Sequence, residues 1–164
     1  MKIFFDLIEV LEQEMKSYDK LYSFLEKDFS CVTHLDRDGL SLNNSKKQHL
    51  LEKLFKIGEK RDFFVSQISK TYSDGKKMLS LREIIQIAPE ELKEKFKQVY
   101  KNFLALIEKV KEKNEFNKEY IAMSIKRLRA ITNNLNKYQK VDTTYDYKGR
   151  VLDTPVGSLV TKEA

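Results

Sequence analysis

Few side chains in this sequence could ligate a metal or attack a substrate: one cysteine, Cys31, and two histidines, His34 and His49. Cys31 and His34 are three residues apart, a spacing that can place two ligands on one side of a helix. A structural or catalytic metal site needs at least one more ligand, and none follows at a suitable spacing. We therefore predict no metal site and no cofactor, with Cys31 as a buried thiol and both histidines on the surface.

The segment Asp36-Arg37-Asp38-Gly39 looks like the beginning of a calcium-binding loop. An EF-hand loop ends with a glutamate at its twelfth position, which binds the ion through both oxygens. Counted from Asp36, the twelfth residue is Lys47, whose ammonium group repels a cation. The sequence therefore argues against calcium binding.

Signatures of catalysis are also missing from the sequence. It contains no glycine-rich phosphate loop and no nucleophile elbow. The acidic residues of the predicted helices mostly lie four positions from a lysine, as Glu12 does from Lys16, and such pairs sit on solvated faces. We predict a protein that is not an enzyme and has no small-molecule substrate.

Composition points to long helices. Of the 164 residues, 41% are hydrophobic and 34% are charged, whereas glycine occurs five times and proline twice. All-β folds use glycine and proline freely in turns, so the sequence predicts an all-α fold. A single cysteine excludes an internal disulfide and suits a reducing compartment. No apolar run is long enough to span a membrane, and acidic residues from Asp6 onward interrupt any signal peptide, so we expect a cytoplasmic protein.

Apolar residues at alternating intervals of four and three predict two long helices. The first helix is expected over about residues 3–31 and the second over about residues 45–72, with Arg61 interrupting the apolar seam of the second. The aspartates, glycine and asparagines of residues 33–44 favour a turn between them. The first seam comprises Phe4, Ile8, Leu11, Met15, Tyr18, Tyr22, Leu25 and Phe29.

A short helix and a very long helix follow. Ser80 and Glu83 form a capping-box pattern at the start of the short helix, and Pro89 suits the first turn of the last helix, expected over about residues 89–136. Asn114 and Asn117 interrupt the apolar seam of this helix. Polar residues in a seam usually fix register or partner choice, and we assign that role to both. The seam comprises Leu92, Phe96, Val99, Phe103, Leu106 and Val110, and then Ile121, Ile125, Leu128, Ile131 and Leu135.

These elements predict an antiparallel bundle or hairpin of long helices with one short helix, formed by residues 1–140. From Val141 the sequence changes to turn-forming and polar residues, with too few large apolar side chains for a core of their own. Residues 141–164 are therefore expected to form an extended, flexible C-terminal tail.

Positive charge is concentrated in the last helix. Residues 89–140 hold 13 basic and 7 acidic residues, against 15 and 14 in residues 1–88. A basic helix with an apolar stripe can bind nucleic acid, an anionic membrane or an acidic partner helix. No helix-turn-helix spacing is present, and Leu128, Ile131 and Leu135 suit contact with a protein helix better. We therefore favour a protein partner over nucleic acid.

Three features occur in a characteristic order along the chain. The short helix ends in Ala88-Pro89-Glu90-Glu91, the last helix contains Asn114-Glu-Phe-Asn117, and the tail has Tyr145 followed by Gly149. With two long helices before them, these features make the chain similar to the FlgN family of flagellar type III export chaperones. The resemblance covers nearly the whole chain.

The resemblance implies a cytosolic chaperone without nucleotide or metal. Such proteins bind the hook–filament junction proteins FlgK and FlgL before export, and deliver them to the export gate. By this resemblance, Leu128, Ile131, Leu135 and Tyr138 are candidate cargo contacts. Tyr145, with Gly149, is the candidate docking element for the gate protein FlhA.

Alternatives from other classes remain open at this point. A sibling chaperone for the filament cap or for flagellin differs only in its cargo. A basic helical protein that binds nucleic acid or a membrane surface predicts steeply salt-dependent binding. A purely structural coiled-coil protein predicts a stable self-dimer, and self-association is possible for the chaperone as well.

Overall fold

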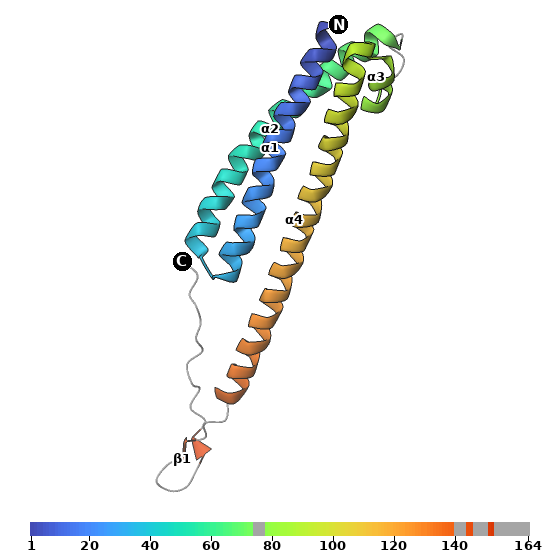
Figure 1. Cartoon of the computed structure of the whole chain (residues 1–164). Coiled ribbons are helices and arrows are strands. Elements are labelled where there is room, and N and C mark those ends of the chain that lie inside the picture. The colour runs from blue at the N-terminus through green and yellow to red at the C-terminus, as the bar shows by residue number, and fades with distance from the viewer. Residues whose placement is uncertain (74–77, 140–143, 146–150, 153–164) are drawn as a thin grey trace. The chain divides into compact units, whose positions relative to one another are not determined.

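The computed structural model of the chain describes residues 1–73, 78–139, 144–145 and 151–152, with side chains described as far as Leu135. Nearly all of these residues are helical, as the composition predicts. The helices are α1 (Lys2–Thr33), α2 (Arg37–Tyr72), α3 (Leu81–Ile87) and α4 (Glu90–Gln139), and two short strands follow, β1 (Thr144–Tyr145) and β2 (Val151–Leu152). Figure 1 shows the long helices and the short α3 between α2 and α4. The predicted all-α fold class is confirmed.

Helices α1 and α2 form an antiparallel hairpin. Buried charged residues join them at two levels: Glu14 bonds to Arg61 near the middle of α1, and Asp28 bonds to Lys47 near its end. Contacts that rise along one helix while falling along the other establish the antiparallel direction. Arg61, which breaks the apolar seam of α2 in the sequence, is thus the partner of a buried carboxylate.

The second helix begins earlier than the sequence predicts. We expected its start near Ser45, but α2 starts at Arg37, because Asp36 caps it by accepting a hydrogen bond from the backbone N–H of Gly39 at 2.8 Å. A Cβ at position 39 would meet the Asp36 carboxylate, so any residue other than glycine would shift this side chain. Asn43, which we read as part of a turn, is buried and donates hydrogen bonds to the Phe24 carbonyl and to Asp28.

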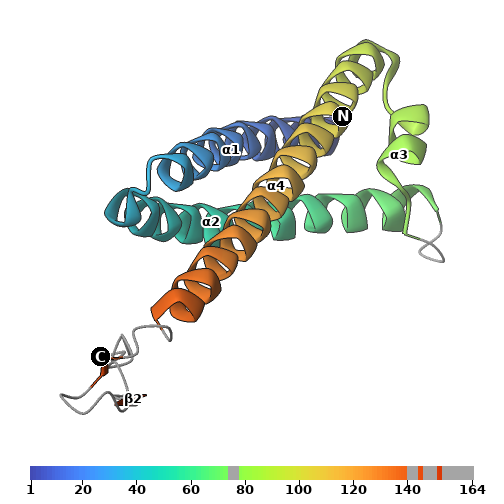
Figure 2. The same cartoon turned by 90° about the horizontal axis from the view of Figure 1, so that it is seen from below.

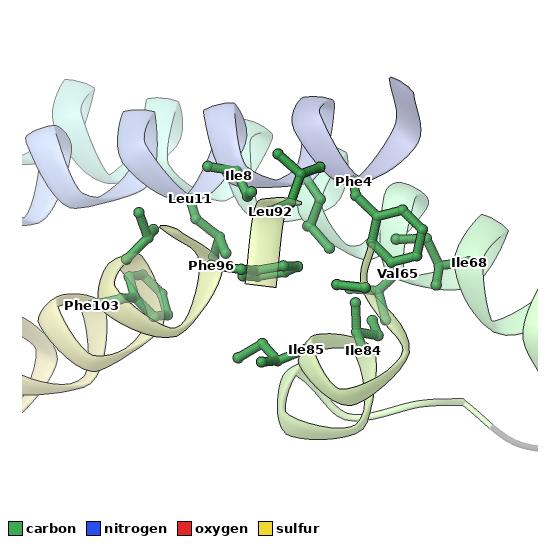
Figure 3. Close-up of a cluster of buried hydrophobic side chains, with 13 residues drawn as sticks. Phe4, Ile8, Leu11, Val65, Ile68, Ile84, Ile85, Leu92, Phe96 and Phe103 are labelled. Carbon is green, nitrogen blue, oxygen red and sulfur yellow. The ribbon is translucent and has the colours of Figure 1, made fainter. Parts of the chain in front are cut away.

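The hydrophobic core lies where α3 meets the first turns of α1 and α4 and the last turns of α2. Figure 3 shows Phe96 of α4 between Ile8 and Leu11 of α1 and Ile85 of α3. Both Phe4 and Phe96 are fully buried, as the seam spacing predicts. Burying side chains of this size stabilises the fold by about 2–3 kcal/mol each.

The short helix α3 is held by the capping box that its sequence predicts. The Ser80 hydroxyl accepts a hydrogen bond from the backbone N–H of Glu83 at 3.3 Å, and the Glu83 carboxylate accepts one from the Ser80 N–H at 2.7 Å. Ile84 and Ile85 then point into the core. Ala88 is extended, as expected before a proline, and α4 starts at Glu90.

Helix α4 runs parallel to α1 and therefore antiparallel to α2. Its contacts with α1 advance together along both helices: Lys95 pairs with Glu12 at 3.1 Å, Phe103 lies edge-on to Tyr18, and Asn117 bonds to the carbonyl of Leu25. Figure 2 shows the first, yellow part of α4 running obliquely to α1 and α2. The first part of α4 therefore packs along α1, as far as the ring contact of Phe116 with Phe29.

The chain divides into two units, Met1–Lys118 and Glu119–Ala164. The first holds the hairpin, α3 and the first part of α4. In the second, α4 continues to Gln139, and Thr144 and Tyr145 pair in antiparallel register with Leu152 and Val151. This strand pair lies within the segment for which the sequence predicts an extended tail.

Candidate functional site

The second half of α4 carries large apolar side chains in solvent. Leu128, Ile131 and Leu135 are 59%, 56% and 58% exposed, and Ile125 is 45% exposed. Together with the half-buried Ile121, they follow one another at intervals of four, three, three and four residues. That spacing keeps them on one side of a helix. We call these five residues the α4 stripe.

The stripe continues the buried face of the same helix. Leu92, Phe96 and Val110 are buried within the first unit. The spacing that links them continues through Asn117 to Ile121 and Leu128. One face of one helix is therefore core in its first half and solvent-exposed in its second. Ile121 and Ile125 were not among our predicted contact residues, although the same seam spacing indicates them.

Basic side chains border the stripe. Arg127 lies next to Ile131 and Arg129 next to Ile125 around the helix, and both are exposed; within the described part of the chain they form no ion pair. A row of exposed aliphatic side chains costs free energy in water, and such rows are common at interaction sites. The arrangement suits an amphipathic helix whose apolar face covers the stripe and whose acidic residues meet these cations.

The two asparagines of the sequence prediction have different surroundings. Asn117 is 4% exposed, and its amide nitrogen donates a hydrogen bond of 2.6 Å to the Leu25 carbonyl, while its side-chain oxygen has no hydrogen-bond partner among the described residues. Asn114 is exposed and lines a hollow between helices of the first unit. The structure thus places Asn117 at the α1–α4 contact and leaves Asn114 accessible.

The remaining predicted contact residues are only partly described. The backbone of Tyr138 belongs to α4, but its side chain lies outside the described part. Tyr145 pairs with Val151 in the two-stranded ladder. Gly149 lies outside the described residues.

The side chains that could have carried metal or acid–base chemistry have structural partners. Asp36 caps α2 and lies 4.0 Å from the buried Cys31 sulfur, while His34 Nδ1 is 2.8 Å from the Ser30 carbonyl. In the described ranges no three His, Cys, Asp or Glu side chains gather as a metal site would require. Burial raises the pKa of Glu14 above its usual value, although Arg61 opposes this, and burial also raises the pKa of Tyr18.

Comparison with known families agrees with this arrangement. Residues 1–152 match the family described as FlgN protein, which is nearly the whole chain. The chain belongs to the FlgN family. The resemblance that we drew from the Ala88-Pro89 junction, the asparagine pair and the tail tyrosine is therefore confirmed.

FlgN-family proteins are flagellar export chaperones that bind hook-associated proteins, and they are not enzymes. The helical bundle of the present FlgN-family chain fits that role. Neither the curated proteins nor the solved structures contain a match to the chain. Among the described helices, none combines the length and apolar character needed to cross a membrane.

Proposed function

We propose that this chain is a cytoplasmic export chaperone that binds the junction proteins FlgK and FlgL and delivers them to the flagellar export gate. The α4 stripe holds the cargo, and the contact residues are Leu128, Ile131 and Leu135 of the stripe together with Tyr138. Residues 1–140 form the bundle, and residues 141–164 form a tail that docks on the gate protein FlhA through Tyr145 and Gly149.

The observation that supports this proposal most strongly is the exposed stripe itself. It has the spacing of a core-facing helix side, yet Leu128, Ile131 and Leu135 are more than half exposed. Junction proteins polymerise through amphipathic terminal helices, which expose apolar faces before assembly. A second amphipathic helix laid along the stripe would remove both apolar faces from water.

Release is as important for a chaperone as binding. A stripe of a few aliphatic side chains on one helix buries a modest area, and ordering two partners offsets much of the gain. The bordering cations, Arg127 and Arg129, accelerate encounter with an acidic cargo surface more than they tighten the complex. Such a contact can hold cargo and still surrender it at the gate.

The test replaces Leu128 and Leu135 together by Asp in the full-length chain. Cargo binding would bury both new carboxylates, which should abolish co-purification with FlgK and FlgL. The helical circular dichroism should stay unchanged, because both positions are exposed in the free chain. Met123→Asp is the matched control: Met123 is 52% exposed on the same helix, and its position in the sequence puts it on the opposite face. It should retain cargo.

Three results would contradict the cargo assignment. Unchanged binding by the double variant would remove the stripe from the cargo contact. Capture of cap protein or flagellin, with no binding of FlgK or FlgL, would make the chain a sibling chaperone. Steeply salt-dependent binding to DNA or anionic vesicles, without any flagellar partner, would favour the basic-helix alternative.

The tail is tested separately. Tyrosine combines a large apolar ring with a polar tip and is common at the centre of interfaces. Tyr145→Ala should weaken binding to the cytosolic domain of FlhA at least about tenfold and leave FlgK and FlgL binding unchanged. Tyr147→Ala is the control for loss of a neighbouring ring. Equal effects of both variants on the gate would contradict a specific role for Tyr145.

A further inference from the structure

A hollow of about 710 Å³ opens in the first unit between α2 and α4, with α1 as its floor. We call it the three-helix groove. Its lining residues come from all three helices: Tyr18, Leu21 and Leu25; Asn44, Lys47, Gln48 and Leu51; and Ile107, Val110, Lys111 and Asn114.

The groove has the repeat of a helix-packing site. On each helix the first and last lining residues are seven positions apart: Tyr18 and Leu25, Asn44 and Leu51, Ile107 and Asn114. Seven residues are two turns and rise about 10 Å, so each helix offers one heptad. A fourth helix placed here would present side chains at i, i+3 or i+4, and i+7 to complete the bundle.

The floor is apolar and partly open to solvent. Leu25 and Val110 are buried, while Tyr18, Leu21 and Ile107 are half-buried and can still lose accessible surface. Leu51 stands at the rim and is 46% exposed. These side chains are already held on helices, so covering them costs little additional ordering.

The rim is polar, and its charge selects the partner. The side chains of Asn44, Gln48 and Asn114 make no hydrogen bond within the described part of the chain. The lining contains no carboxylate. Lys47 is directed to Asp28, whereas Lys111 forms no ion pair among the described residues. The groove therefore offers amides and one unpaired cation, which suit carboxylate and hydroxyl groups and repel a basic helix.

We propose that the three-helix groove binds one amphipathic helix of the exported cargo, with its apolar side chains on the floor and a carboxylate opposite Lys111. This inference rests on the proposed function and adds a second cargo contact, separate from the α4 stripe. The α4 stripe of a second copy of this chain is a poorer occupant, because Arg127 and Arg129 border that stripe and would come close to Lys111.

A synthetic peptide tests the chemistry of the groove with the full-length protein. The probe is a fluorescent two-heptad helix with leucine at its a and d positions and glutamate elsewhere, and its partner probe has lysine in place of glutamate. The glutamate peptide should bind more tightly. Leu51→Asp should weaken that binding at least about tenfold, and Lys111→Glu should reverse the preference between the peptides.

Two controls locate the peptide. Phe55→Asp changes a side chain that is 69% exposed, one turn along α2 from Leu51 and outside the lining, and should bind the peptide like the parent. The Leu128→Asp, Leu135→Asp double variant removes any peptide held by the α4 stripe and should keep the peptide that binds in the groove. Loss of binding in that double variant, or no effect of Leu51→Asp, would overturn the groove assignment.

Cross-linking then identifies the occupant. A photoreactive amino acid at Gln48, an exposed lining residue, is placed in the full-length chain co-expressed with FlgK and FlgL. A cross-link to a terminal helix of either cargo supports the proposal. Co-purification of cargo without a cross-link leaves the proposed function standing and overturns the groove contact. A cross-link to a second copy of the chain overturns it in favour of self-association, and failure of FlgK and FlgL to co-purify overturns the proposed function itself.

Discussion

Arg61 Nη1 lies 2.8 and 3.0 Å from the two carboxylate oxygens of Glu14, joining the middle of α1 to α2. The Glu14 side chain is 3% exposed, whereas that of Arg61 is 26% exposed and also reaches Asp62. The contact occupies a position of the α2 seam where an apolar residue would be usual. It therefore fixes which residues of the two helices face each other, because a shifted register would separate the two charges and leave the buried carboxylate without its partner.

Removing only the cation should be costly. Arg61→Met leaves the Glu14 carboxylate buried without its partner, and we expect the free energy of unfolding to fall by about 3–5 kcal/mol. The double variant Glu14→Leu, Arg61→Leu should recover most of this loss, because leucines suit the seam. Urea denaturation of the single and double variants measures both effects. A single variant as stable as the parent would show that the pair carries no energetic role.

The raised pKa of Glu14 predicts a pH dependence of stability. Burial disfavours the carboxylate more than Arg61 favours it, so the folded chain holds the Glu14 proton above pH 4.5, where the unfolded chain releases it. Protons bound only in the folded state make stability fall as pH rises. In the Glu14→Gln variant, the free energy of unfolding should no longer decrease as pH rises above 4.5. Urea denaturation at several pH values measures this. An identical slope in parent and variant would contradict the assignment.

Replacing Leu35, in the turn between α1 and α2, by glycine should stabilise the fold. Leu35 has a φ of 56°, and the Asp36 N–H bonds to the Cys31 carbonyl at 2.9 Å, a helix end that glycine usually closes. Leu35 is 85% exposed, so its side chain contributes little packing. Leu35→Gly should raise the melting temperature by a few degrees.

A matched variant separates backbone conformation from side-chain loss. Leu42→Gly removes another exposed leucine, but inside α2, where glycine costs about 1 kcal/mol. It should lower the melting temperature. A decrease in both variants would show that the conformation of Leu35 carries no strain.

Asn117 should be replaceable by leucine at a gain in stability. Its side-chain oxygen is buried without a hydrogen-bond partner, and the position continues the apolar face of α4. Asn117→Leu should raise the free energy of unfolding by about 1 kcal/mol, whereas Asn114→Leu, at an exposed position, should change it little. A loss of stability in Asn117→Leu would show that its bond to the Leu25 carbonyl dominates.

Heptad spacing was sufficient to predict the long helices and the core. Phe4 and Phe96 are buried because a repeat of four and three residues keeps apolar side chains on one side of a helix. The Ser80 capping box and the Ala88-Pro89 break are local signals, and both were correct. Such features depend on neighbours in the sequence, which is why they can be read from it.

Features that depend on distant residues could not be predicted in the same way. Asn43 looks like a turn residue, yet its amide nitrogen donates to Asp28 across the hairpin, and it lies within α2, which starts at the Asp36 cap. The three-helix groove combines residues that are far apart in the sequence and come together only when α1, α2 and α4 pack. For the α4 stripe, the spacing identified the residues, but only the fold distinguishes its exposed half from its buried half.

The continuity of α4 makes the angular phase of the stripe a property of the sequence between its two halves. Each residue turns an α-helix by about 100°, so deletion of one residue between Val110 and Ile121 would rotate the exposed face away from the line of the buried one. Insertion of a whole heptad into the parent sequence turns the helix by about 700°, which is within about 20° of two full turns, and would preserve the alignment. A point substitution leaves this angular relation unchanged, whereas most changes in length do not. Insertions and deletions in this stretch should therefore be restricted to multiples that preserve the helical repeat.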